Sequence, residues 1–204
     1  MKLTRALPWI VATAALGALA GGIAARMLSQ KTVALQSGTW LPQPRPLASF
    51  QLTDHNGRPF DNAALNGHPS LLFFGYSNCP DLCPATLAIM RDVQRRAPIP
   101  GLQFLFITVD PERDTPAALK QYLHHFSSEF VGLSAGRASL APLMRTLAAD
   151  AESQGTHGGG NQLTHSATLY LLDTHGRLAA VYSPPLNAAT LSADLHTIAR
   201  ASVL

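Results

Sequence analysis

The chain contains only two cysteines, Cys79 and Cys83, and both lie in the stretch FGYSNCPDLCPATL at residues 74–87. Two thiols this close together can form a redox couple, bind a metal ion, or be a structural pair with no chemistry. Each cysteine is followed by a proline, which pushes the residue before it toward extended backbone. We therefore predict a tight loop that enters a helix, whose N-terminus favours thiolate over thiol at both cysteines.

The number of residues between the cysteines bears on this choice. Dithiol oxidoreductases commonly place two residues between their cysteines, whereas this chain has three, Pro80, Asp81 and Leu82. The wider loop still permits a disulfide between Cys79 and Cys83, but it also lets two sulfurs bind one soft ion from two directions. Two thiolates suit Cu(I) or zinc, and such an ion needs a third ligand.

The segments around the cysteines predict an α/β domain. Residues 70–76 form an apolar run with the length of a buried strand, and residues 84–96 have apolar side chains at helical spacing. Further predicted elements are strands at 47–52, 59–60, 102–109 and 130–133, helices from 116 and over 140–149, a hairpin of 168–172 and 178–182, and a helix over 191–201. This order is that of a thioredoxin-like fold, a mixed central sheet with helices on both faces. Ligands of such open sheets bind at the carboxyl ends of strands, where the cysteines lie.

The third ligand is sought among eight histidines. His165 comes just before a strand expected to be central, and in a thioredoxin-like fold the loop before that strand faces the cysteine loop. Oxidoreductases of this fold normally have a cis-proline there, whereas this chain has no proline between Gln154 and Leu172. This difference favours metal binding over redox catalysis. His157, in a glycine-rich loop, is the second candidate, and six histidines are expected to be solvated surface residues: His55, His68, His124, His125, His175 and His196.

Two aspartates in the stretch TVDPERDTP are further candidates. Asp110 ends a predicted strand and Asp114 precedes a predicted helix cap, so both have ordinary structural explanations. The alternative is that they also shape the electrostatics beside the cysteine loop or form part of a partner surface.

The N-terminal residues predict a membrane anchor. Residues 6–25 carry no charge and are long enough to cross about 30 Å of hydrocarbon as a helix. The flanking basic residues slightly favour export of everything after Arg26. A cleaved signal peptide is the alternative, because Ala18-Leu19-Ala20 has the small-x-small pattern of a cleavage site.

These features predict an anchor over residues 1–29, a proline-containing linker over 30–46 and a folded domain over 47–204. The chain is 47% hydrophobic and only 13% charged, which excludes a disordered protein. Its formal net charge of +3 arises from scattered basic residues, so we expect no nucleic-acid partner.

Together these segments resemble the SCO/SenC family, copper-delivery proteins for assembly of the dinuclear copper site of cytochrome c oxidase. The resemblance covers about residues 47–200 and rests on LLFFGYSNCPDLCP, TVDPERDTP and HSATLYLLDTHGR. It implies that Cys79 and Cys83 are thiolate ligands and His165 an imidazole ligand of copper, as Cu(I) or Cu(II). It also implies a single-pass protein of the bacterial inner membrane with its domain in the periplasm. The chain departs from the family at Thr164, where many members have an acidic residue, and in its glycine-rich THGGGNQLT.

The leading hypothesis is a membrane-anchored chaperone that binds one copper ion and passes it to the copper-bearing subunit of cytochrome c oxidase. Other copper chaperones or thiol reductants are further expected partners. The alternative is a thiol-disulfide reductase, in which Cys79 or Cys83 attacks a disulfide to keep the copper-ligand cysteines of that subunit reduced. A redox or copper sensor is a third hypothesis.

Overall fold

The structure is a computed structural model that describes residues 33–147, 152–153, 163–164 and 167–201. The predicted anchor and two candidate ligands, His157 and His165, lie outside the described residues. Within the described ranges, no helix combines the length and the apolar character needed to cross a membrane.

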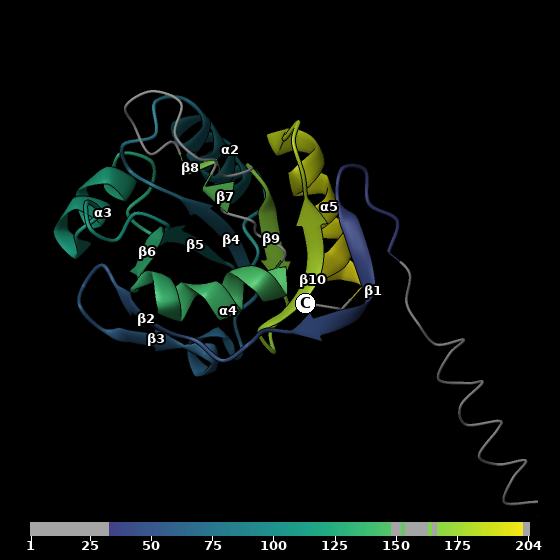
Figure 1. Ribbon diagram of the computed structural model, residues 1–204. Coiled ribbons are helices and arrows are strands. Elements are labelled where there is room, and N and C mark those ends of the chain that lie inside the picture. Colours follow the sequence, from purple (N-terminus) through teal and green to yellow (C-terminus); the bar gives the residue numbers. More distant parts are fainter. Residues whose placement is uncertain (1–32, 148–151, 154–162, 165–166, 202–204) are drawn as a thin grey trace, which may run out of the picture. The chain divides into compact units, whose positions relative to one another are not determined.

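The described domain is built around an eight-stranded mixed sheet with strand order β1-β10-β9-β4-β5-β6-β2-β3 (Figure 1). The central strands β4, β5 and β6 run parallel, and the remaining neighbours pair antiparallel. A separate pair, β7 and β8, forms a small second sheet. The strands are β1 Thr39–Pro46, β2 Gln51–Asp54, β3 Pro59–Asp61, β4 Ser70–Gly75, β5 Gln103–Thr108, β6 Val131–Ser134, β7 Glu152–Ser153, β8 Leu163–Thr164, β9 Leu169–Leu172 and β10 Arg177–Tyr182.

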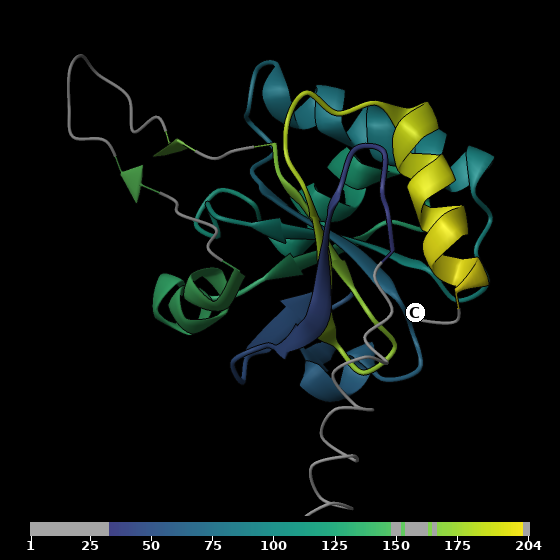
Figure 2. The same ribbon diagram turned by 90° about the vertical axis from the view of Figure 1, so that its right-hand side faces the viewer.

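Helices cover both faces of the main sheet (Figure 2). On one face, Leu71 and Phe73 of β4 pack in a core with residues of α2, α3 and α5. On the other face, Leu72 and Phe74 pack with residues of α4. Side chains alternate along a strand, so a strand covered on both faces needs a continuous apolar run. The predicted thioredoxin-like class with helices on both faces is confirmed. The helices are η1 Asn62–Leu65, α2 Leu82–Arg96, α3 Pro116–His124, α4 Arg137–Leu147 and α5 Ala188–Arg200.

The folded domain begins earlier than predicted. The prediction of a linker over 30–46 is wrong for residues 39–46, which form β1 and pair antiparallel with β10. The register of this pairing is irregular between Trp40 and Arg45. Proline cannot donate a hydrogen bond, and β1 tolerates its prolines because it is an edge strand with a single partner.

The segment before β1 is held on the domain by a buried carboxylate. Asp194 of α5 is 1% exposed. It accepts hydrogen bonds from the backbone N–H groups of Gln36 at 2.6 Å, Ser37 at 2.9 Å and Gly38 at 3.2 Å, and from the Ser37 hydroxyl at 2.9 Å. A Cβ at Gly38 would lie 2.4 Å from the ring of Tyr182, so only glycine allows this approach. Residues 36–38 are therefore held on α5 by one carboxylate.

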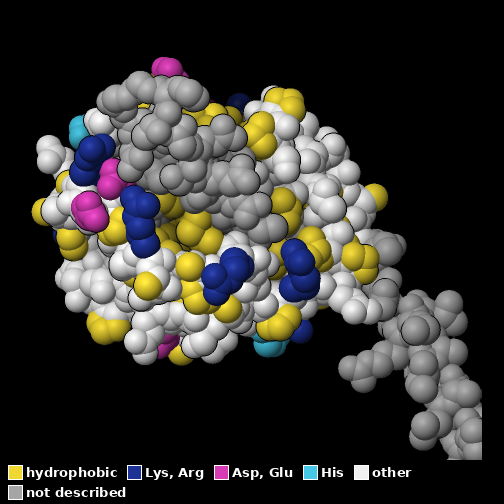
Figure 3. Space-filling view, viewed as in Figure 1, with side chains coloured by type: hydrophobic (Ala, Val, Ile, Leu, Met, Phe, Trp, Pro, Cys, Tyr) yellow, Lys and Arg dark blue, Asp and Glu magenta, His cyan; other side chains and the backbone are white. Residues whose placement is uncertain are grey.

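Charged side chains are dispersed on the face shown in Figure 3. The Lys and Arg side chains of the described residues lie there as separate groups, with hydrophobic and uncharged side chains between them. Opposite charges reduce the local field further, as where Arg91 pairs with Asp92 at 3.1 Å.

We expect the substitution Asp194→Ala to lower the free energy of unfolding by about 2–4 kcal/mol, because it leaves several buried donors without an acceptor. Urea denaturation measures this change, and amide hydrogen exchange at Ser37 and Gly38 should accelerate. The control Asp92→Ala removes a carboxylate that is 43% exposed, so its effect should stay below about 1 kcal/mol. Equal effects of the two substitutions would contradict this account of the segment.

Candidate metal centre

The two cysteines lie side by side where β4 ends and α2 begins. Cys79 is in the connecting loop, where its backbone N–H donates to the carbonyl oxygen of Tyr76 at 3.3 Å. Cys83 lies in the first turn of α2, and its backbone N–H donates to the Sγ atom of Cys79 at 3.3 Å. The two cysteines are thiols rather than a disulfide in this structure. The loop therefore brings two sulfurs together at the carboxyl end of a central strand.

The predicted loop conformation is wrong for Cys83, which lies within α2 rather than before it. Pro84 is accommodated because the first turn of a helix has N–H groups without intrahelical acceptors, so a missing N–H there disrupts no bond. The predicted approach of both sulfurs to the start of a helix is retained.

Burial, not the helix dipole, determines the charge of Cys83. Its side chain is 0% exposed and that of Cys79 is 8% exposed. Burial raises the pKa of the Cys83 thiol far above its usual range, and the neighbouring Cys79 and Asp114 raise it further. A helix N-terminus stabilises a thiolate by less than burial destabilises it. The predicted preference for thiolate is therefore wrong for Cys83 when no cation is bound. A soft cation that replaces the proton would neutralise the buried thiolate.

Gly75, the last residue of β4, determines how closely the Cys83 sulfur approaches the sheet. A Cβ at this position would lie 3.0 Å from Sγ of Cys83 and 2.8 Å from a ring carbon of Phe106. Every residue other than glycine would displace one of these groups. The sequence interpretation did not identify Gly75, although a glycine that ends an apolar run is a recognised signal for close approach.

Asp114 connects the cysteine loop to the next strand. It is 1% exposed, and its carboxylate accepts hydrogen bonds from the Ser77 N–H at 3.0 Å, from the Ser77 hydroxyl, and from the Thr108 hydroxyl at 2.5 Å. Ser77 belongs to the cysteine loop, and Thr108 is the last residue of β5. The sequence interpretation identified Asp114 but not Ser77 or Thr108, because hydroxyl residues in loops and strands carry no distinct signal.

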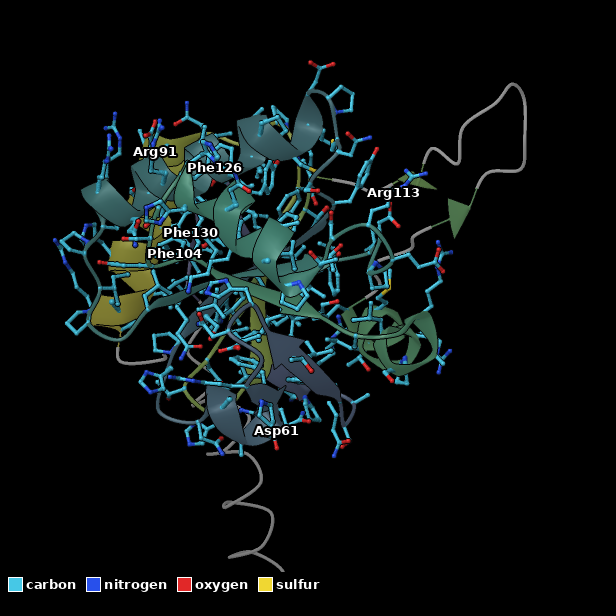
Figure 4. All side chains as sticks on the ribbon, turned by 90° about the vertical axis from the view of Figure 1, so that its left-hand side faces the viewer. Asp61, Arg91, Phe104, Arg113, Phe126 and Phe130 are labelled. Carbon is cyan, nitrogen blue, oxygen red and sulfur yellow. The ribbon has the colours of Figure 1, made fainter. Side chains whose placement is uncertain are left out.

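Asp110 joins this network through its backbone. Its N–H donates to the Thr108 hydroxyl at 3.0 Å, and its carboxylate pairs with Arg113 at 3.6 Å. Arg113 extends at the surface from the loop before α3 (Figure 4). Burial raises the pKa of Tyr76, and the charges of Cys79, Cys83 and Asp110 add to this effect. Asp110 therefore contributes to the field at the edge of the site, while Asp114 supports its base.

Among the residues that the structure describes, no histidine joins the two cysteines in a group that could hold a metal ion. His68, His124, His125 and His175 are exposed as predicted, whereas His55 is half-buried and its Nδ1 accepts the Gly132 N–H at 3.0 Å. Within the described ranges, no group of three His, Cys, Asp or Glu side chains could hold a metal ion.

The position of β9 bears on the remaining candidate. Phe73 near the end of β4 pairs with Leu169 at the start of β9, so the residues just before β9 lie at the carboxyl end of β4. Ala167 is 5% exposed there. His165 precedes Ala167 by two positions in the sequence, and its role as a ligand stays a prediction.

Three comparisons with known proteins agree on one family. Residues 41–200 match the family model described as SCO1/SenC. An SCO2-like protein of Rickettsia conorii is 37% identical over 132 residues, which span 63% of this chain and 64% of that protein, just under two thirds of its length. Bradyrhizobium japonicum ScoI, solved with copper bound, is 37% identical with a TM-score of 0.66, covering 74% of this chain and 98% of that one. Yeast Sco1 with copper bound is 29% identical with a TM-score of 0.67, covering 77% and 90%.

The two aspartates should differ in their effect on the cysteine loop. We expect Asp114→Ala to lower the free energy of unfolding by about 2–4 kcal/mol, because three buried donors lose their acceptor. The reaction of Cys79 with a maleimide should accelerate as Ser77 is released. Asp110→Ala is the control, with an effect below about 1 kcal/mol and an unchanged labelling rate. A wild-type labelling rate in Asp114→Ala would show that this carboxylate does not hold the loop.

Proposed function

Because the chain belongs to the SCO1/SenC family, we propose that it is a copper chaperone that binds one copper ion through Cys79, Cys83 and His165. It delivers this ion to the dinuclear copper site in the copper-bearing subunit of cytochrome c oxidase. Support comes from relatives solved with copper bound. The observation that carries the proposal is the pair of buried, adjacent thiols at the carboxyl end of β4.

The donor set suits Cu(I). Two thiolates and one imidazole give the soft three-coordinate ligation that Cu(I) accepts, whereas Cu(II) recruits a water or another fourth ligand. Binding releases the two thiol protons to solvent, and the metal ion takes their place beside the sulfurs. The apolar surroundings of Cys83 favour this exchange, because they disfavour a thiolate that has no cation next to it.

The two sulfurs differ in exposure, and this difference determines from which side the partner subunit approaches the metal ion. Cys79 is 8% exposed, while Cys83 is 0% exposed and packs against Gly75. A thiolate of the partner subunit therefore reaches the metal ion from the side of Cys79. Cys79 dissociates first and Cys83 last as the partner's ligands replace them. Leu82, 39% exposed between the two cysteines, adds an apolar contact for the partner.

The same proposal includes the membrane. Residues 6–25 anchor the protein in the bacterial inner membrane, and the domain lies in the periplasm.

The reductase hypothesis is the second candidate, and the placement of Cys83 beside the Cys79 sulfur favours it. Cys79 is the more exposed and would attack a disulfide of the partner. Cys83, whose N–H contacts the Cys79 sulfur at 3.3 Å, would then resolve the mixed disulfide and leave a Cys79–Cys83 disulfide. A thiol reductant would restore the pair.

Copper retention against a competing chelator tests the ligand set. We expect one copper per chain in the reduced wild-type protein and none in Cys79→Ala or Cys83→Ala. His165→Ala should bind Cu(I) about 10- to 100-fold more weakly, because loss of a ligand leaves two-coordinate copper. His157→Ala is the matched control and should retain wild-type affinity.

The rate of thiol-disulfide exchange with a model disulfide separates the two functions. His165→Ala should leave this rate unchanged while copper affinity falls. If His165→Ala binds copper as tightly as His157→Ala does, His165 is not a ligand. If His165→Ala loses thiol-disulfide exchange to the same extent as copper binding, this substitution does not separate the reductase role from the chaperone role.

A further inference from the structure

Tyr122 of α3 has a buried hydroxyl that lacks a hydrogen-bond partner in the described part of the chain. Its ring packs edge-on against Phe106, with ring centroids 6.1 Å apart, and against Phe126 at 5.5 Å. Phe126 packs against the buried cluster that contains Phe104 and Phe130, and all three are labelled in Figure 4. Burying a hydroxyl without a partner is unfavourable, so an unpaired group of this kind calls for an explanation.

The position of Tyr122 relates it to the two thiols. Phe106, on which the Tyr122 ring packs, meets the Cys83 sulfur at Gly75, where a Cβ would contact both. Tyr122 packs against the same apolar cluster that contains Cys79 and Cys83. Burial raises the pKa of Tyr122, and the charges of Cys83, Cys79 and Asp114 add to this, in that order. The hydroxyl therefore keeps its proton as a donor, and among these three charges that of Cys83 acts most on its pKa.

Both sulfurs already have hydrogen-bond partners. Cys79 accepts the backbone N–H of Cys83 at 3.3 Å, and Cys83 accepts the backbone N–H of Tyr76. Cys83 is the more buried of the two, and Phe106 lies beside it at Gly75. A neutral thiol is a weak acceptor, whereas a thiolate bound to copper is a charged and much stronger one. The change from thiol to copper thiolate therefore strengthens an acceptor in the cluster against which Tyr122 packs.

We propose that Tyr122 is a positioning residue of the copper site, whose hydroxyl donates a hydrogen bond to the Cys83 sulfur when copper is bound. This inference rests on the proposed function, because it requires Cys83 to bind copper. The hydroxyl is unsatisfied in the copper-free protein and satisfied in the loaded one. It thus stabilises the loaded form relative to the empty form and adds to copper affinity without contacting the metal ion.

The chain offers a matched control in Tyr182 of β10. Its hydroxyl is also buried and unpaired in the described part of the chain, but its pKa is raised by burial and then by the charge of Asp194 rather than of a cysteine. Tyr122→Phe and Tyr182→Phe each remove one oxygen and keep the ring. Neither variant should lower the free energy of unfolding of the copper-free protein, since each removes an unsatisfied polar group.

Competition with a Cu(I) chelator and absorption spectroscopy of the Cu(II) form test the proposal. We expect Tyr122→Phe to bind Cu(I) about 10- to 100-fold more weakly than wild type, and Tyr182→Phe to match wild type. The sulfur-to-Cu(II) charge-transfer band should shift to lower energy in Tyr122→Phe alone. A hydrogen bond stabilises the thiolate electrons, and its loss raises their energy. A merely structural role for Tyr122 would not move this band.

The outcomes separate this inference from the proposed function. If wild type binds copper and Tyr122→Phe matches Tyr182→Phe in affinity and in band energy, the role of Tyr122 is wrong and the chaperone proposal stands. If wild type retains no copper and equals Cys79→Ala, both are wrong. Weaker binding together with the band shift in Tyr122→Phe, and neither change in Tyr182→Phe, supports the hydrogen bond.

Discussion

The close packing of the Cys83 sulfur against the end of β4 is the constraint on which the site depends. Gly75 leaves room for this sulfur 3.0 Å from where a Cβ would stand, and Phe106 closes the same space. The sulfur is thereby kept from water, and the pKa of its thiol is raised by burial. A thiolate at this position is stable only with a cation beside it. The packing at the end of the strand therefore favours a metal-bound thiolate over a thiolate without a cation.

The surrounding structure supports that arrangement from two directions. Below the loop, the buried Asp114 carboxylate joins Ser77 to Thr108, so the loop after β4 is tied to the end of β5. The parallel pairing of β4 and β5 places these two ends together, from Ser70 opposite Gln103 to Gly75 opposite Thr108. The antiparallel pairing of β4 with β9 brings the residues before Leu169 to the same edge. One edge of the sheet thus collects side chains that lie far apart in the sequence.

Local patterns predicted most of the elements, and the errors have physical reasons. The buried run of β4, the helix after Pro84 and the cap at Thr115 follow from periodicity and capping, and the structure has all three. Strand β1 was not predictable, because its prolines are typical of a linker and only its pairing with β10 shows otherwise. The protonation of Cys83 depends on burial by distant residues, which outweighs a local dipole that the sequence does reveal. The network of Asp114 is equally tertiary, since no local pattern shows that its carboxylate faces Ser77.

X-ray absorption spectroscopy of the Cu(I)-loaded protein tests the central claim most directly, because it reports the atoms bound to the metal ion. The account predicts a mononuclear site with two sulfur neighbours and one nitrogen neighbour that shows the outer-shell scattering of an imidazole. It further predicts loss of that nitrogen signal in His165→Ala. Three or more sulfurs around copper, or a second copper nearby, would mean that ions are shared between chains and would contradict a site built from Cys79, Cys83 and His165 of one chain.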